Sequence, residues 1–334
     1  MATQALISPP IVVARPSWSR YAASFNCRIG LLVLVLVPAE IFLARRFHLY
    51  GLSQYADVWP SVPIFLGCLW YGHKCRLPRL IDACELAVWA RVLFNVLTLL
   101  MQIAGRSPYP IVDRQLGAID AQMHFQTVSI IHIVARLPPL VTILDFIYSL
   151  VTWFIIAAIV VPPFFGDAVA TRRFVTGMVL ASLIATILFT FVPAAGPWTI
   201  QPILPTQKQA AVSTYLVHLK HSGPVLLESA HDGIVAFPSF HVVYAILSAA
   251  ALGTIRRLRT PAWILATLIC ISTITTGWHY GIDVLAGIIL SIIVIWLARQ
   301  IEPDGRWRDT PADSALATRP FPVTLPTRHA SNLL

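Results

Sequence analysis

The sequence predicts an all-α protein, a polytopic bundle of helices embedded in a membrane. Of its 334 residues, 57% are hydrophobic and only 12% are charged, whereas a soluble domain carries about 25% charged residues. The mean hydropathy is +0.73, and the apolar residues gather in long runs. Several runs approach the roughly 20 residues that a transmembrane helix needs, so the class of protein is already defined by composition.

We expect about eight transmembrane helices, one for each apolar run. The last two are separated by almost nothing, so the residues "WHYG" between them must turn tightly at the membrane surface. The expected helices cover residues 29–44, 57–72, 83–104, 138–162, 174–193, 240–255, 261–278 and 281–299.

The net charge of +9 comes from short basic clusters that lie between the apolar runs. This distribution follows the positive-inside rule, so we interpret it as a topology signal and expect no binding of nucleic acid. If the N-terminus is cytoplasmic, the clusters at 74–79, 172–173 and 256–259 all fall on the cytoplasmic side. The pair Arg45–Arg46 is the exception, because it falls on the outer side.

The ends of the chain differ in composition from its middle. Residues 1–28 show no cleavable signal pattern and are expected to be a cytoplasmic segment. Residues 29–104 carry the first transmembrane helices. Residues 301–334 are rich in Pro, Thr, Ala and Arg without an apolar period, which predicts a disordered cytoplasmic tail. The five cysteines show no paired metal spacing and are interpreted as packing residues.

Two motifs place histidines at the edges of apolar runs. They are "FPSFH", which ends at His241, and "GWHYGIDVLAG", which contains His279 and Asp283. The sixth helix descends from His241 and the seventh returns, so both histidines are expected at the membrane face opposite the basic loops. His279 and Asp283 are four residues apart on one helical face, where the carboxylate can accept a hydrogen bond from one ring nitrogen. The other nitrogen is then free to act as a nucleophile or a base.

These motifs resemble those of the type 2 phosphatidic acid phosphatase superfamily, which includes lipid phosphatases, vanadium haloperoxidases and inositol phosphorylceramide synthases. "PSFH" at 238–241 matches its Pro-Ser-x-His element, and "STITTGWHYGID" at 272–283 matches the spacing of its Ser-Arg-x5-His-x3-Asp element. Among the branches of the superfamily, the residues of the two motifs look most like those of the inositolphosphotransferase-like branch. The resemblance implies that six of the eight helices form a phosphatase-like core and that residues 105–300 are a catalytic membrane domain.

The resemblance also implies a chemical role for each motif residue. His279 would attack phosphorus and form a phosphohistidine, and Asp283 would orient its ring. His241 would protonate the leaving alkoxide and later activate the acceptor, which suits imidazole because its pKa of about 6.5 is close to working pH. The implied substrate is a lipid phosphoester at the extracytoplasmic face, which we expect to be the periplasmic face of a bacterial inner membrane. The acceptor is water in a phosphatase, and in an inositolphosphotransferase-type reaction the headgroup is transferred to a lipid acceptor.

Two positions depart from the family pattern. Thr273 stands where the family has Arg, and the stretch "FVPAAGPW" at 191–198, in the place of a Lys/Arg–Pro element, contains no cation. A phosphoryl group in transfer normally needs positive partners, so other residues are expected to supply them. The candidate substrate-binding residues are Ser239, Ser272, Thr273, Lys208, Lys220 and His231, and Arg114, Arg136 and His221 are further basic residues on the same side.

Three alternatives to an active phosphoesterase stay open. The chain could be a transporter or channel in which His279 and Asp283 relay protons, although no inverted repeat supports this. It could be a metalloenzyme in which His241, His279 and Asp283 bind zinc or iron, although no HExxH motif or histidine box supports that. It could also be an inactive relative that lacks the basic set. From these patterns we expect no bound metal and no cofactor.

Overall fold

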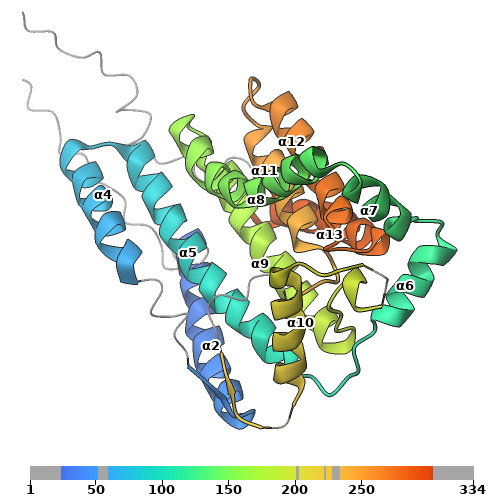
Figure 1. Ribbon diagram of the computed structural model, residues 1–334. Coiled ribbons are helices and arrows are strands. Elements are labelled where there is room, and N and C mark those ends of the chain that lie inside the picture. Colours follow the sequence, from blue (N-terminus) through green and yellow to red (C-terminus); the bar gives the residue numbers. More distant parts are fainter. Residues whose placement is uncertain (1–23, 52–58, 201–202, 222, 228–233, 304–334) are drawn as a thin grey trace, which may run out of the picture.

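The computed structural model of the chain describes residues 24–51, 59–200, 203–221, 223–227 and 234–303 (Figure 1). The expected cytoplasmic segment up to residue 23 and the expected tail from residue 304 lie outside these residues. The described part forms α2 (Phe25–Arg46), β1 (Leu49–Tyr50), η1 (Trp59–Ser61), α4 (Val62–Cys75), α5 (Pro78–Gly105), α6 (Asp113–Gln122), α7 (Thr127–Ala135), α8 (Pro138–Phe164), α9 (Ala168–Phe191), η2 (Pro197–Thr199), α10 (Gln207–Lys220), β2 (Val225–Leu226), α11 (Phe240–Leu252), α12 (Arg259–Thr275) and α13 (Gly281–Ile301).

Five of these helices are long and apolar enough to cross a membrane, namely α2, α5, α8, α9 and α13. The chain is therefore an all-α, polytopic membrane protein, as predicted. Five of the about eight expected spans are thus supported, and α4, α11 and α12 are shorter, with 14, 13 and 17 residues. At a rise of 1.5 Å per residue they reach about 20 to 25 Å, which is less than the hydrocarbon thickness of roughly 30 Å.

The apolar runs that predicted these three helices include residues that are not helical in the structure. The run at 240–255 ends in a turn after Leu252, and the run at 57–72 begins before α4, which starts only after the 3-10 turn η1. Arg76 ends α4 in a left-handed conformation, with φ 54°. Hydropathy therefore located these segments, but it could not separate helix from turn.

The core of the bundle lies between α5, α8, α9, α11 and α13, which contact one another pairwise in most combinations. Small residues allow some of these contacts to be close. A Cβ added to Gly287 of α13 would lie 2.9 Å from the Ser239 carbonyl oxygen and 3.1 Å from Cβ of Val242. The beginning of α11 therefore rests directly on the backbone of α13, and this contact fixes the two histidine motifs relative to each other.

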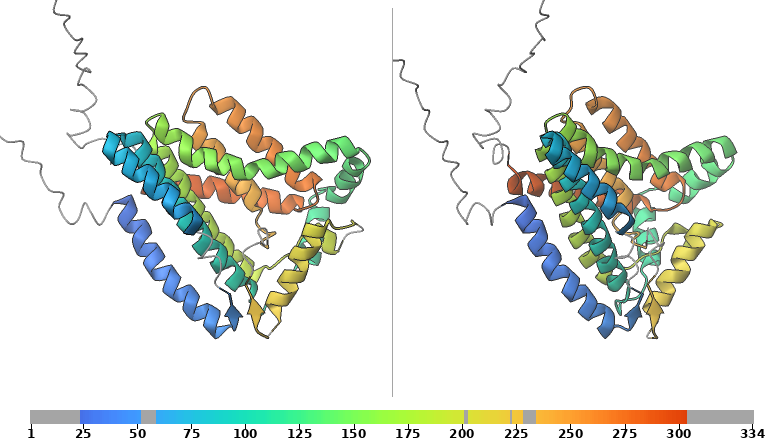
Figure 2. Two further views of the ribbon diagram at one scale, coloured as in Figure 1. Left: turned by 60° about the vertical axis from the view of Figure 1, so that its left-hand side comes forward. Right: turned by 90° about the vertical axis from the view of Figure 1, so that its left-hand side faces the viewer.

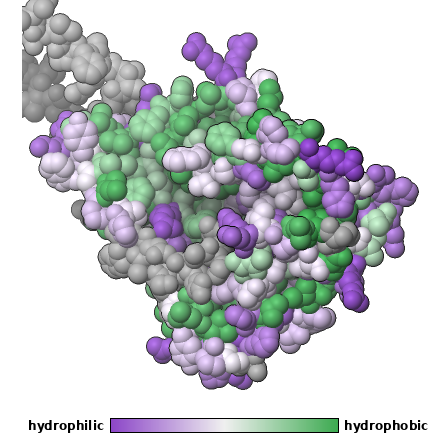
Figure 3. Space-filling model, viewed as in Figure 1, coloured by the Kyte–Doolittle hydropathy of each residue, from purple (hydrophilic) through white to green (hydrophobic). Residues whose placement is uncertain are grey.

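The surface of the bundle is apolar where the helices face outward. Large hydrophobic side chains such as Leu34, Phe42 and Trp153 are more than two-thirds exposed, at 68%, 68% and 69%. Hydrophobic residues are spread over much of the face shown in Figure 3. Exposure of this kind is what a lipid environment permits.

Basic residues meet at one end of the bundle. Arg28 at the start of α2 forms a salt bridge with Glu302, and Arg173 near the start of α9 donates to the Glu302 carbonyl oxygen at 2.8 Å. Arg79 at the start of α5 donates to the carbonyl oxygen of Phe164 at the end of α8, at 3.2 Å. The clusters at 74–79 and 172–173, which the sequence assigns to one side of the membrane, thus lie at the same end of the bundle.

The opposite end is covered by elements from the two long connections (Figures 1 and 2). Helices α6, α7 and α10 fall within residues 105–137 and 194–239. β1 pairs in parallel with β2, and this pairing connects the end of α2 to the segment after α10. The pair Arg45–Arg46 therefore lies at this end, away from the other basic clusters.

Candidate active site

The histidine of the first motif lies in the first turn of α11. His241 stacks on Tyr148 of α8, with ring centroids 4.0 Å apart and an interplanar angle of 17°. The Tyr148 hydroxyl also lies 3.2 Å from Nδ1 of His241. Because the ring is held by stacking and by one polar contact, its orientation in the bundle is fixed.

The histidine of the second motif lies in the turn between α12 and α13. Gly277 makes this turn with φ +78°, a conformation that glycine adopts without a steric penalty. Nδ1 of His279 lies 3.0 Å from the Ala236 carbonyl oxygen and 3.5 Å from Oδ2 of Asp283. A carbonyl oxygen can only accept, so Nδ1 carries the proton in this contact and Nε2 keeps its lone pair.

Asp283 holds the turn as well as the imidazole. Its Oδ2 accepts a hydrogen bond from the backbone N–H of Tyr280 at 2.9 Å, as part of a capping box at the start of α13. Its carbonyl oxygen accepts from the backbone N–H of Ser239 at 3.1 Å. The two histidine motifs are therefore directly hydrogen-bonded to each other.

His241 and His279 line one cavity of about 280 Å³. Their ring centroids are 6.2 Å apart, with an interplanar angle of 53°. The structure thus brings together the two imidazoles that the sequence expected at one face, at a separation suited to acting on one small group.

The rest of the cavity has an apolar wall and a basic side. Phe94 and Met101 of α5 and Val151 and Ile155 of α8 form part of the apolar wall. Lys208 of α10 lines the basic side, with its Nζ 5.9 Å from the centroid of the Trp278 ring. Among the described residues that line this cavity, Lys208 is the one lysine or arginine.

The other expected substrate-binding residues lie elsewhere. Ser239, Ser272 and Thr273 are fully buried and do not line the cavity. Ser272 and Thr273 donate to carbonyl oxygens of their own helix, both at 2.7 Å. Lys220 donates hydrogen bonds to Ser107 and to the Tyr109 carbonyl oxygen, at 2.8 to 3.1 Å, and it does not line the cavity. His231 lies outside the described residues.

Several side chains around the site were not among the expected site residues. Tyr148 and Trp278 line the cavity beside the histidines, with their rings stacked at 5.9 Å. Asp113 and Asp120 of α6 are 2% and 4% exposed and bind backbone groups near the site. Their seven-residue spacing within a polar stretch of a long connection was the available signal, since it places both carboxylates on one face of a helix.

The described residues contain no group of three or more His, Cys, Asp or Glu side chains placed to hold a metal ion. His241, His279 and Asp283 therefore do not form such a group, although all three are near the cavity.

The fold and the cavity define a polytopic membrane protein with paired histidines opposite its basic end. The sequence model of the PAP2 superfamily matches residues 114–297, which is more than half of the chain, and the chain belongs to that superfamily. Membership suggests phosphoesterase chemistry. No curated protein and no solved structure matches the chain.

Proposed function

We propose that this protein is an integral-membrane lipid phosphatase or phosphotransferase that cleaves a lipid phosphoester through a phosphohistidine. The observation that carries the proposal is the pair of imidazoles, His241 and His279, on one cavity with centroids 6.2 Å apart. The superfamily match supports the reaction class.

In the first step Nε2 of His279 attacks phosphorus, the P–N bond forms and the P–O bond to the lipid alcohol breaks. His241 gives its proton to the leaving alkoxide. In the second step His241 takes a proton from the acceptor, whose oxygen attacks phosphorus, and the P–N bond breaks. Each step has a lower barrier than direct displacement of the lipid alcohol by the acceptor.

The hydrogen bond from Nδ1 of His279 to the Ala236 carbonyl oxygen, at 3.0 Å, supports the nucleophilic role. It keeps the proton on Nδ1 and the lone pair on Nε2. Asp283, 3.5 Å from the same nitrogen, stabilises the positive charge that the ring acquires when it is phosphorylated.

Lys208 is proposed as the cation that the phosphoryl group needs. The family positions at Thr273 and at 191–198 hold no cation, and a phosphoryl group in transfer carries negative charge on its equatorial oxygens. Lys208 lines the same cavity as both histidines, so it can approach those oxygens. The apolar wall from α5 and α8 suits the chain of a lipid substrate.

Two finer features belong to the same proposal. The resemblance of the motifs to the inositolphosphotransferase-like branch supports transfer of a headgroup to a lipid acceptor as one form of the reaction. The basic end of the bundle supports a site that faces away from the cytoplasm, which is the periplasm in a bacterial inner membrane.

The test uses the purified protein in detergent with phosphatidate and diacylglycerol pyrophosphate. We expect phosphate release from the wild type, and phosphate-labelled substrate quenched in alkali, where phosphohistidine survives, should leave label on the protein. His279→Ala should abolish both signals. His218→Ala is the matched control, because His218 is exposed on α10 and does not line the cavity. Release by His279→Ala at the wild-type rate would refute the nucleophile.

A further inference from the structure

Helix α6 carries two buried carboxylates outside the long apolar helices. Asp113 and Asp120 are seven residues apart, about two helical turns, so they lie on the same face. They are 2% and 4% exposed, although α6 is a short helix of ten residues with polar composition. A buried carboxylate is costly unless it is hydrogen-bonded, and each of these is bonded to a different segment of the site.

Asp113 binds the segment between α9 and η2. Its Oδ2 accepts from the backbone N–H of Ala195 and its Oδ1 from that of Gly196, both at 2.9 Å. Burial raises the pKa of Asp113, and these two bonds oppose that rise. Ala195 itself lines the cavity that contains His241 and His279. Asp113 therefore holds a piece of the cavity wall by its backbone.

The conformation of that segment depends on glycine. Gly196 has φ +140°, and a Cβ there would lie 2.3 Å from the Trp198 ring. The Trp198 ring in turn meets Trp278 edge-on at 5.3 Å, and Trp278 directly precedes His279. The segment held by Asp113 thus contacts the second histidine motif.

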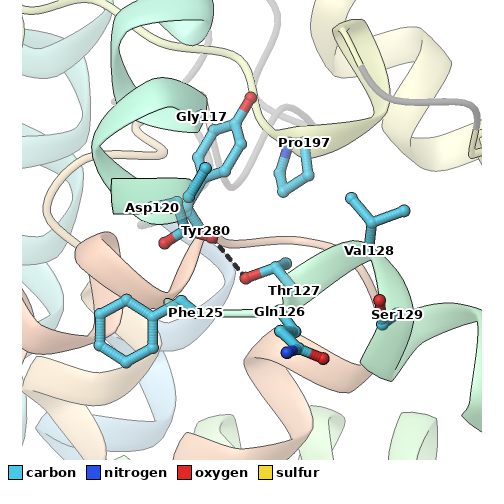
Figure 4. A pocket seen from close by; sticks show the side chains of 10 residues that line it. Gly117, Asp120, Phe125, Gln126, Thr127, Val128, Ser129, Pro197 and Tyr280 are labelled. Carbon is cyan, nitrogen blue, oxygen red and sulfur yellow. Dashed lines mark hydrogen bonds between the residues drawn. The ribbon is translucent and has the colours of Figure 1, made fainter. Parts of the chain in front are cut away.

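Asp120 binds the beginning of α13. Its Oδ1 accepts from the backbone N–H of Ile282 at 2.9 Å, and its Oδ2 accepts from the hydroxyl of Thr127 at 2.6 Å. Figure 4 shows Asp120 and Thr127 in contact beside Tyr280. The N–H groups at a helix start have no partner in their own helix, and a carboxylate there stabilises the helix.

The turn after α6 also rests on this helix start. A Cβ added to Gly281 would lie 2.5 Å from the Phe125 ring, so only glycine lets the two segments approach this closely. Tyr280, between His279 and Gly281, places its hydroxyl 3.4 Å from Oδ1 of Asp113. One face of α6 thus contacts both segments that meet at the histidines.

We propose that Asp113 and Asp120 are positioning residues that fix the cavity wall at Ala195 and the His279–Asp283 pair relative to each other. The proposal rests on the proposed function. Its physical basis is that a misplacement of about 1 Å in an active site can cost on the order of 100-fold in rate. Neither carboxylate lines the cavity of the two histidines, so neither takes part in the chemistry.

The two residues call for different substitutions. In Asp113→Asn, one carboxylate oxygen is replaced by an N–H₂ group. This group faces a backbone N–H, so one hydrogen bond is lost and two donors point at each other. In Asp120→Asn, the amide oxygen still accepts from Ile282 and the amide nitrogen can donate to the Thr127 hydroxyl. Asp120→Leu keeps the approximate size and removes both bonds.

We expect Asp113→Asn and Asp120→Leu to lower kcat about tenfold or more per folded molecule, with KM within about twofold of wild type. Asp120→Asn should restore most of the rate. The matched control is Asp167→Asn, because Asp167 accepts from the backbone N–H of Ala170 at the start of α9, at the basic end, and Asn caps a helix as well as Asp. Phosphate release is measured together with the amount of monodisperse protein and its thermal unfolding midpoint.

The outcomes separate this inference from the proposed function. If His279→Ala is inactive while Asp113→Asn and Asp120→Leu keep wild-type kcat per folded molecule, the positioning role is wrong and the function stands. If His279→Ala keeps activity, the proposed function is wrong. If either aspartate variant yields no folded protein, Thr127→Val decides, since it removes one hydroxyl from Asp120 and no backbone bond. It should lower kcat roughly two- to tenfold, and an unchanged kcat would overturn the inference.

Discussion

At the scale of single residues, the site depends on how each imidazole is held. His279 is held through Nδ1 by the Ala236 carbonyl oxygen and by Asp283. His241 is held by Tyr148 through ring stacking and one polar contact. The two rings thus have different surroundings, which supports different roles for them.

The proposed acid role of His241 predicts a dependence on the leaving group. His241→Ala should lower the rate about 100-fold or more with a lipid alkoxide, because general acid catalysis contributes roughly that much. With an aryl phosphate such as p-nitrophenyl phosphate, whose leaving group departs without protonation, the loss in phosphohistidine formation should be much smaller. The measurement is the rate of label incorporation with each substrate.

His279→Ala provides the comparison for that experiment. It should remove activity toward both substrates, because the proposed nucleophile is needed whatever the leaving group. Equal losses for the two substrates in His241→Ala would contradict the acid role of His241.

At the scale of elements, the arrangement of the two histidine motifs depends on the contact between α11 and α13. Gly287 lies under Ser239 and Val242, and the Ser239 N–H donates to the Asp283 carbonyl oxygen. The two helices that carry the histidine motifs are therefore packed backbone to backbone, and α6 holds the adjoining turns.

Gly287→Ala should reduce stability and activity together. Its methyl group would lie 2.9 Å from the Ser239 carbonyl oxygen, and overpacking of this kind costs about 1 to 3 kcal/mol. We expect a lower thermal unfolding midpoint in detergent and a lower rate of phosphate release.

Gly67→Ala is the matched control. Gly67 is also a glycine inside a helix, in α4, but no atom lies within 4 Å of an added Cβ. The unfolding midpoint and the rate should stay at or above the wild-type values. If Gly287→Ala behaves like Gly67→Ala, the close contact between α11 and α13 is not needed.

At the scale of the whole molecule, the bundle has two different ends. The ends of α2, α9 and α13 that carry Arg28, Arg173 and Glu302 meet at one of them. Helices α6, α7 and α10 cover the other (Figure 2). From the positive-inside rule we propose that the first end faces the cytoplasm.

This orientation predicts the accessibility of single cysteines in a cysteine-free background. Gln115→Cys on α6 should react with a membrane-impermeant maleimide in intact bacterial cells whose outer membrane has been made permeable. Arg257→Cys, at the turn between α11 and α12, should react only after the inner membrane is opened. Both positions are exposed. The reverse pattern would place the site on the cytoplasmic side.

The sequence by itself determined the class of the protein and the location of its main motifs. Composition indicates a membrane bundle because hydropathy is a sum over residues and needs no knowledge of packing. The spacing of His279 and Asp283 places them on one helical face because helical periodicity is local. The alternation of helices along the chain was enough to expect His241 and His279 at the same end.

The tertiary structure decided the rest. The lengths of α4, α11 and α12, the Ala236 carbonyl oxygen under His279, and Tyr148 beside His241 depend on contacts between segments far apart in the chain. Asp113 and Asp120 look like ordinary polar residues of a connection until their partners, 82 and 162 residues away, are known. Local patterns fix period and hydropathy, whereas the partner of a buried polar group is fixed by how the helices pack.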